Sequence, residues 1–91
     1  MIINRMINIT GKVQGVFYRG SAREQAERLG VKGEVKNMPD GSVLLIAEGA
    51  EETVMALIAW CHYGPPRAEV QEVTVKEGRI KGYKDFKVIR F

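Results

Sequence analysis

The chain opens with a segment in which apolar and polar residues alternate, and two later stretches have the apolar spacing of a helix. Alternation predicts a strand with one buried face, whereas repeats of three and four residues predict an amphipathic helix. In the first alternating segment, 5–13, Ile7, Ile9, Gly11 and Val13 share one face. Helices are predicted at 21–29 and 52–63, and further strands at 31–37, 42–48, 68–76 and 84–91. The predicted order is therefore βαββαβ followed by a C-terminal strand.

Local sequence signals mark the ends of these elements. Ser21 and Glu24 have the spacing of a capping box, which predicts Ser21 as the N-cap of the first helix. Gly30 is the residue type that commonly ends a helix, and the Gly-Pro-Pro run at 64–66 ends the second one. The Met-Pro-Asp-Gly segment at 38–41 predicts a tight turn, because proline presets φ and Asp-Gly tolerates the bend. The strands on either side of it are expected to form a hairpin.

This order of elements indicates an α+β fold, the ferredoxin-like two-layer sandwich. Right-handed crossovers would place both helices on one face of an antiparallel sheet. A chain of 91 residues suits a single domain, 1–91, that buries one core. Since this architecture supports many activities, function has to be argued from particular residues.

Charge and cysteine content exclude several classes of protein. The net charge of +3 tolerates an anionic ligand but is too diffuse to indicate nucleic-acid binding. The single cysteine, Cys61, excludes an internal disulfide and a multi-cysteine metal site. Residues 1–6 lack the apolar core of a signal peptide, and no stretch is apolar enough to cross a membrane. We expect a cytoplasmic protein that does not associate with membranes.

The loop before the first predicted helix has features of an anion-binding site. It carries Gly15, Val16, Phe17 and Tyr18 and ends on Arg19. The first N–H groups of a helix are free, and the helix dipole favours a negative ligand there. Successive loop N–H groups can also surround an oxyanion, and a guanidinium matches phosphate oxygens. Glycines and capped helices occur in ordinary connections too, so the loop alone leaves both interpretations open.

The remaining reactive residue types favour structural roles. Val13 stands where a Cys-x₅-Arg phosphatase loop would carry its nucleophile, and Cys61 lies on the apolar stripe of the second helix. His62 follows at the end of that helix, where a surface or capping role is expected. No cluster has metal-ligand spacing, and there is no Walker A motif. Four acidic residues are interpreted as capping residues and solvated helix starts: Glu24, Glu48, Glu51 and Glu52. Any chemistry would then use no metal, no cofactor and no covalent nucleophile.

Chemistry of this kind suits an acyl phosphate better than a phosphate ester. An acyl phosphate expels a carboxylate, whose pKa of about 4 makes protonation of the leaving group unnecessary. Holding the phosphoryl oxygens and orienting a water molecule could therefore suffice. Asn37 is the candidate for the water, because its amide both donates and accepts beside the predicted turn. The alternative is that Asn37 bonds the backbone of its own turn.

Motifs of one known family run in order along the chain. The most specific is Gly11-Lys12-Val13-Gln14-Gly15-Val16-Phe17-Tyr18-Arg19. The others are Leu29-Gly30-Val31-Lys32-Gly33, Val35-Lys36-Asn37, Asp40-Gly41-Ser42-Val43, Gly49, Trp60-Cys61 and Gly64-Pro65-Pro66. Together they resemble the acylphosphatases, whose fold is the βαββαβ sandwich. The resemblance implies metal-independent hydrolysis of the carboxyl-phosphate bond.

The resemblance also implies roles for individual residues. Arg19 corresponds to the phosphate-binding arginine and Asn37 to the water-positioning asparagine of the family. The backbone N–H groups from Gly15 to Arg19 (Gly15, Val16, Phe17, Tyr18 and Arg19) correspond to its phosphate cradle. The chain departs from the common pattern at Glu34, Lys36 and Tyr18, which flank the site without removing an assigned role. The partners implied are a small acyl phosphate substrate and inorganic phosphate as product and inhibitor. The family module also occurs fused to large carbamoyl-transfer maturation proteins. Because this chain ends at Phe91, we expect a free-standing enzyme, which we also expect to be monomeric and to need no cofactor.

The competing hypothesis is a non-catalytic ferredoxin-like module that binds an anion or RNA. RNA-recognition domains share the βαββαβ order, and Lys81-Gly82-Tyr83 resembles the start of an RNP1 motif. However, Lys84-Asp85 breaks that motif, which also lies at the wrong end of the chain. The predicted strand at 42–48 carries no aromatic residue on which a base could stack. The sequence therefore favours the hydrolase and predicts no nucleic-acid partner.

Overall fold

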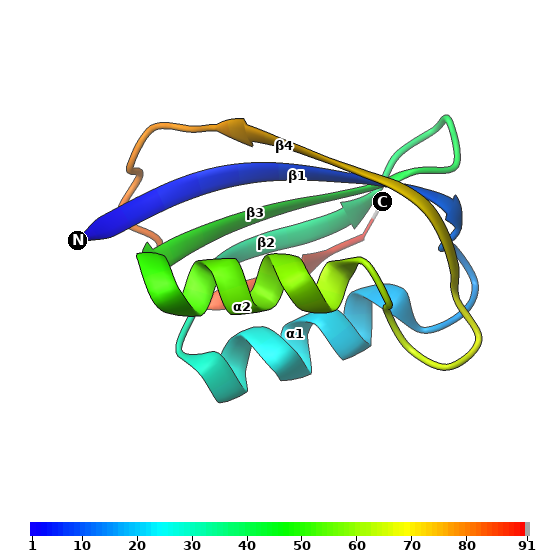
Figure 1. Cartoon of the computed structure of the whole chain (residues 1–91), viewed down its shortest axis with the longest axis horizontal. Helices are drawn as coiled ribbons and strands as arrows, with labels where there is room; N and C mark the ends of the chain where they lie inside the picture. Colours follow the sequence, from blue (N-terminus) through cyan, green and yellow to red (C-terminus); the bar gives the residue numbers. More distant parts are fainter. Residues whose placement is uncertain (91) are drawn as a thin grey trace.

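A computed structural model describes residues 1–90 of the chain. Two helices and five strands follow one another in the predicted order (Figure 1). The elements are β1 (Ile2–Lys12), α1 (Tyr18–Leu29), β2 (Lys32–Asn37), β3 (Val43–Ala50), α2 (Glu51–Cys61), β4 (Glu69–Glu77) and β5 (Phe86–Ile89). The predicted α+β sandwich is confirmed, with α1 and α2 side by side on one face of the sheet.

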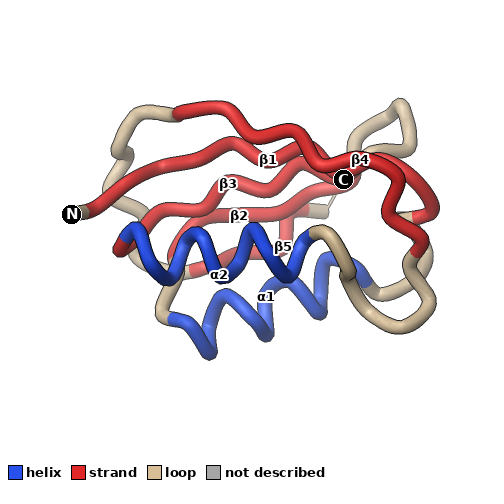
Figure 2. Tube along the Cα trace, viewed as in Figure 1, coloured by secondary structure: helices blue, strands red, loops and turns tan. Residues whose placement is uncertain are grey.

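The sheet has the strand order β4-β1-β3-β2-β5 and is mixed (Figure 2). The β1–β3, β1–β4 and β2–β3 pairs are antiparallel, but β5 lies parallel to β2. This last pairing differs from the wholly antiparallel sheet predicted from the sequence. The segment 78–85 carries the chain from one edge of the sheet to the other and reverses its direction. As a result, β5 runs alongside β2 and brings residues 89 and 90 to the same end of the sheet as Asn37.

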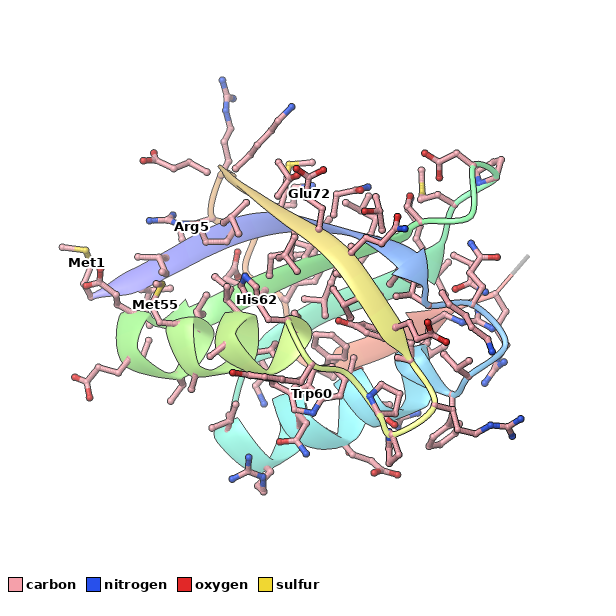
Figure 3. All side chains as sticks on the ribbon, turned by 45° about the vertical axis from the view of Figure 1, so that its right-hand side comes forward. Met1, Arg5, Met55, Trp60, His62 and Glu72 are labelled. Carbon is pink, nitrogen blue, oxygen red and sulfur yellow. The ribbon has the colours of Figure 1, made fainter. Side chains whose placement is uncertain are left out.

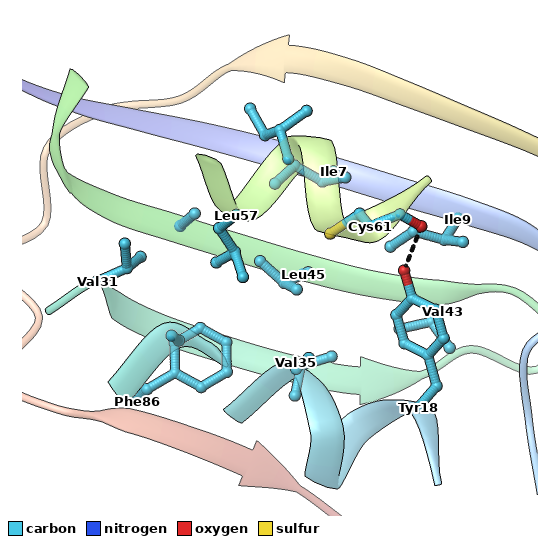
Figure 4. Packing of buried hydrophobic residues seen from close by; sticks show 14 of the residues in the cluster. Ile7, Ile9, Tyr18, Val31, Val35, Val43, Leu45, Leu57, Cys61 and Phe86 are labelled. Carbon is cyan, nitrogen blue, oxygen red and sulfur yellow. Dashed lines mark hydrogen bonds between the residues drawn. The ribbon is translucent and has the colours of Figure 1, made fainter. Parts of the chain in front are cut away.

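The hydrophobic core fills the space between the sheet and the two helices (Figure 4). Ile7 and Ile9 of β1 and Leu57 of α2 are fully buried in it, as the sequence periodicity predicts. Cys61 is also fully buried, which confirms its predicted place in the core. Burial raises the pKa of its thiol to about 12, so the sulfur stays protonated and unreactive at neutral pH.

Helix α1 begins earlier than predicted, and Ser21 is not its N-cap. The N-cap is Phe17, and the amide of Ser21 donates to the Phe17 carbonyl at 3.1 Å inside the first turn. The helix extends back because Tyr18 is held by tertiary contacts. Its hydroxyl donates to the carbonyl of Cys61 at 2.7 Å, and its ring centroid lies 5.2 Å from that of Trp60. Packing on α2 therefore outweighs the local capping signal.

The turn between β2 and β3 is the predicted hairpin. The amide of Met38 donates to the Ser42 carbonyl at 2.8 Å, and Gly41 has a φ of 93°. The Asp40 carboxylate accepts hydrogen bonds from the hydroxyl and the amide of Ser42, and these bonds lower the pKa of Asp40. Side chains other than Asn37 thus satisfy the backbone of this turn.

The predicted capping role of Glu24 is wrong, because α1 begins at Tyr18 and has no acidic residue in its first turn. The predicted role of Glu48 is also wrong. It is not a solvated helix start but a buried side chain, 4% exposed. Its carboxylate accepts hydrogen bonds from the Asn4 amide at 3.0 Å and from the backbone N–H groups of Lys81, Gly82 and Tyr83 at 2.6, 2.8 and 2.9 Å. Burial alone would raise the pKa of Glu48, but these four bonds outweigh it and lower the pKa. Glu51 and Glu52, in contrast, lie in the first turn of α2 as predicted.

Helix α2 ends at Cys61, two residues before the end predicted from the sequence. His62 is the exposed C-cap residue of α2, and its Nδ1 lies 3.1 Å from the Ile58 carbonyl oxygen (Figure 3). The predicted surface or capping position of this histidine is confirmed. Within residues 1–90, neither helix has the length and apolar character needed to cross a bilayer.

Candidate active site

A small pocket of about 120 Å³ opens where the β1–α1 loop meets the ends of β2 and β5. Its walls are formed by Val13, Gly15, Phe17, Tyr18, Arg19, Gly20, Asn37 and Arg90. Among residues 1–90, two arginines line this pocket and no acidic residue does, so the electrostatic potential from these residues favours an anion. The structure thus brings together Arg19 and Asn37, which are 18 residues apart in the sequence.

The loop turns sharply into α1 through two residues with left-handed backbone. Gly15 has a φ of 74°, which glycine adopts without a steric penalty, and Phe17 has a φ of 64°. No side chain caps the helix at Phe17. The free N–H groups of the first turn, with their partial positive charge, therefore belong to the residues that line the pocket. This arrangement suits a bound oxyanion.

Arg19 is the second residue of α1 and lies half-buried at the pocket wall. One of its guanidinium nitrogens, Nη1, donates to the carbonyl of Ile89 in β5 at 3.1 Å. This bond fixes the side chain while leaving the other donors of the guanidinium for a ligand. The contact between Arg19 and Ile89 was not predicted from the sequence, because it depends on β5 lying at the far edge of the sheet from β4.

Asn37 is the last residue of β2 and faces Val43 across the hairpin. Its side-chain oxygen Oδ1 is buried and has no hydrogen-bond partner within residues 1–90. Buried polar atoms are normally paired, so an orphaned acceptor at a pocket needs an explanation. The alternative that this oxygen bonds its own turn does not hold, since Asp40 and the backbone of Met38 and Ser42 make those bonds. An acceptor of this kind is suited to a water molecule or to a donor on a ligand.

Gln14 is a positioning residue that the sequence analysis did not assign. Its Nε2 donates to the carbonyls of Met38 and Ser42, each at 2.9 Å. These bonds tie the loop to the turn that follows Asn37, so the two halves of the site keep a fixed separation. The sequence did contain a signal for this residue, since Gln14 lies within the motif that ends on Arg19. Arg90 was also missed, because nothing in its local sequence points to the pocket.

The pocket walls contain no group prepared to act as a covalent nucleophile. Val13 is buried and apolar at the position where a cysteine phosphatase would have its thiol. The hydroxyl of Tyr18 already donates a hydrogen bond to the carbonyl of Cys61, and burial raises the pKa of this tyrosine. In the part of the chain that the structure describes, no three His, Cys, Asp or Glu side chains are grouped to hold a metal ion.

Comparisons with known proteins agree on one family. The family model described as Acylphosphatase matches residues 5–88. A curated acylphosphatase from Methylococcus capsulatus is 49% identical over 83 residues, which cover 90% of each chain. One from Geobacter sulfurreducens is 47% identical over 89 residues, covering 97% of this chain and 98% of the relative. The structure of an acylphosphatase from Coxiella burnetii superposes with a TM-score of 0.93 at 41% identity, over 97% of this chain and 93% of that one.

Proposed function

The chain belongs to the acylphosphatase family and is a hydrolase acting on acyl phosphates, and we propose that it cleaves them by direct attack of a positioned water molecule. The observation that supports this mechanism most strongly is the shared pocket. It combines the uncapped start of α1, the Arg19 guanidinium and the orphaned oxygen of Asn37. Each of these groups matches one requirement of the reaction.

The phosphoryl group is bound by the loop and by Arg19. Backbone N–H groups of Gly15, Val16, Phe17, Tyr18 and Arg19 donate to its oxygens, and the free donors of the guanidinium complete the set. These are charge-assisted hydrogen bonds, which are stronger than bonds between neutral groups. Negative charge on the phosphoryl oxygens is stabilised in the transition state by donors that are already in position.

Asn37 orients the attacking water through its side-chain amide. The water oxygen forms a bond to phosphorus while the bond from phosphorus to the acyl oxygen breaks. The carboxylate leaves with that electron pair, and the proton of the attacking water passes to the phosphate product or to solvent. Since the leaving carboxylate has a pKa of about 4, the reaction needs neither a general acid nor a Lewis acid. Val13 and the bonded hydroxyl of Tyr18 offer no nucleophile for a covalent intermediate.

We also propose that inorganic phosphate, as the product, competes with substrate for the N–H cradle. The enzyme acts as a monomer in the cytoplasm on small acyl phosphates, with no cofactor and no nucleic-acid or membrane partner.

Hydrolysis of benzoyl phosphate, followed by ultraviolet absorbance, tests the activity and the mechanism. In water enriched in ¹⁸O, attack at phosphorus places the label in phosphate, whereas attack at the carbonyl carbon places it in benzoate. Activity should survive prolonged treatment with EDTA. Label in benzoate, a phosphorylated chain in acid-quenched mass spectra, or loss on chelation with recovery on adding Mg²⁺ would each contradict the mechanism.

A further inference from the structure

Phe17 is an exposed aromatic side chain at the mouth of the phosphate pocket. It is 66% exposed and has a left-handed backbone conformation that bulky residues seldom adopt. The residues on either side, Val16 and Tyr18, are buried. Neither burial nor backbone preference therefore explains a phenylalanine at this position, and strain of this kind is concentrated at functional sites.

Gly20 leaves space for the Phe17 ring. A Cβ atom built at Gly20 would collide with the Cε1 and Cζ atoms of that ring. Gly20 lies in the first turn of α1 and does not have a positive φ, so its backbone does not require glycine. The ring therefore lies directly over the first turn of the helix, next to the N–H groups proposed to bind phosphate.

Phe17, Gly20 and Arg90 also line a second, adjoining pocket of about 300 Å³. The phosphate pocket has a volume of only about 120 Å³ and is lined by the groups proposed to bind the phosphoryl group, so an acyl group bonded to phosphate must extend beyond it. The second pocket shares three lining residues with the phosphate pocket, so an acyl group that extends from the phosphate would lie in it. Its other walls are Arg23, Glu24, Glu27 and Val88.

The charged side chains that line this second pocket, within the part of the chain that the structure describes, balance in sign. Arg23 and Glu27 pair with each other at 3.1 Å, which leaves Arg90 and Glu24 as one charge of each sign. A neutral acyl group is therefore favoured over a charged one. The Phe17 ring offers a flat apolar surface, and the planar guanidinium of Arg90 can stack on an aromatic face.

We propose that Phe17 determines specificity for the acyl group, and that its ring and Arg90 form a subsite for a flat, apolar acyl group. Aromatic acyl phosphates are then favoured over small aliphatic ones. This proposal rests on the proposed function, because it assumes that the phosphoryl group occupies the pocket beside Arg19.

The test is the ratio of kcat/KM for benzoyl phosphate to that for acetyl phosphate. Phe17→Asn removes the ring while keeping a residue that tolerates left-handed backbone. An added aromatic pair contributes roughly a factor of two to ten, so we expect the ratio to fall by about that factor. Phe17→Tyr keeps the ring and should keep the ratio. Tyr63→Asn is the matched control, since Tyr63 is 77% exposed and lies outside both pockets.

Gly20→Ala provides an independent test without removing the ring. The new methyl group should displace the ring and lower the ratio, while the melting temperature should not fall because alanine favours helix. In the Phe17→Asn background, Gly20→Ala should not lower the ratio further. An unchanged ratio in folded Phe17→Asn, or in Gly20→Ala, would overturn the proposal. Failure of the unmodified protein to hydrolyse either substrate would instead contradict the proposed function itself.

Discussion

The segments at 81–83 and 15–19 both present consecutive backbone N–H groups, and they differ in what accepts the hydrogen bonds. The amides of Lys81, Gly82 and Tyr83 all donate to the buried carboxylate of Glu48. At the start of α1, in contrast, no side chain of the described residues caps the helix, and those that line the pocket include Arg19 and Arg90 but no acid. Among residues 1–90, the protein supplies the anion where the bonds hold the fold together, and it supplies none at the loop that we propose binds phosphate.

This contrast has a thermodynamic meaning. Bonds to Glu48 contribute to folding whatever the solution contains, because donor and acceptor belong to the same chain. The bonds proposed from the 15–19 loop to a phosphoryl group contribute only when a ligand is bound, so they should act on affinity and on the transition state. Changes at the two segments should therefore affect different measurements, and five experiments separate them.

Arg19→Ala should have the largest effect, and it should fall on activity. The guanidinium is proposed to contact the phosphoryl oxygens in both the ground state and the transition state, so KM should rise and kcat should fall. Loss of charge-assisted bonds of roughly 1.5–3 kcal/mol each predicts a fall in kcat/KM of at least about 10³-fold. Arg19→Lys should also be severely impaired, because an ammonium lacks the planar fork. Arg28→Ala, an exposed arginine of the same helix, is the control; equal losses in both variants would argue against a specific role.

Asn37→Ala should mainly lower kcat. The amide is proposed to hold water and not the phosphoryl group, so kcat should fall by roughly 10²–10³-fold, by analogy with the loss of one oriented donor. The inhibition constant for inorganic phosphate should stay nearly constant. Circular dichroism checks that the variant is folded. Weak phosphate binding combined with normal turnover at saturation would show that the water is held elsewhere.

Inorganic phosphate should raise the melting temperature through the 15–19 loop. A ligand at one hundred times its dissociation constant stabilises the native state by about 2.7 kcal/mol. In a domain of this size, that corresponds to a rise of roughly 10 °C or more. The rise should vanish in Arg19→Ala and persist in Glu48→Gln. A phosphate effect that survives in Arg19→Ala would place the ion at a different site.

Glu48→Gln should act on stability and leave the phosphate effect in place. The amide that replaces the carboxylate adds a donor among four existing donors, and one buried unsatisfied donor costs about 1–3 kcal/mol. Chemical denaturation should show this loss at neutral pH. If the free energy of unfolding is unchanged, the bonds to segment 81–83 do not stabilise the fold.

The stability that Glu48 contributes should depend on pH in a defined direction. The folded protein lowers the pKa of this carboxyl below its ordinary value of 4.5. A lowered pKa means that the stabilisation is fully present above pH 4.5 and is lost as the pH falls through the folded-state value. The difference in unfolding free energy between the unmodified protein and Glu48→Gln should therefore shrink below pH 4.5. A difference that grows on acidification would mean that the folded state favours the protonated carboxyl.

Much of the fold follows from local patterns along the chain. Alternation placed Ile7 and Ile9 in the core, and helical spacing did the same for Leu57 and Cys61. These patterns are reliable because they depend on the geometry of a single element. The identity of Arg19 and Asn37 as candidates also came from the sequence, through the loop motif and the turn chemistry that surround them. The sequence did not show that both residues line one pocket, because Asn37 reaches that pocket only through the pairing of β2 with β3.

The sequence by itself determined the order of the elements, their buried faces, the β2–β3 turn and the motif that identifies the family. Tertiary structure decided the rest: that α1 begins at Tyr18, that β5 runs parallel to β2, and that Glu48 is buried. In each case the deciding partner is distant along the chain, namely Cys61 for Tyr18, β2 for β5 and segment 81–83 for Glu48. Local propensities amount to a few tenths of a kcal/mol per residue, and burial of a large side chain or pairing of a buried charge exceeds them. Contacts of that size form only when the whole sheet and both helices have assembled.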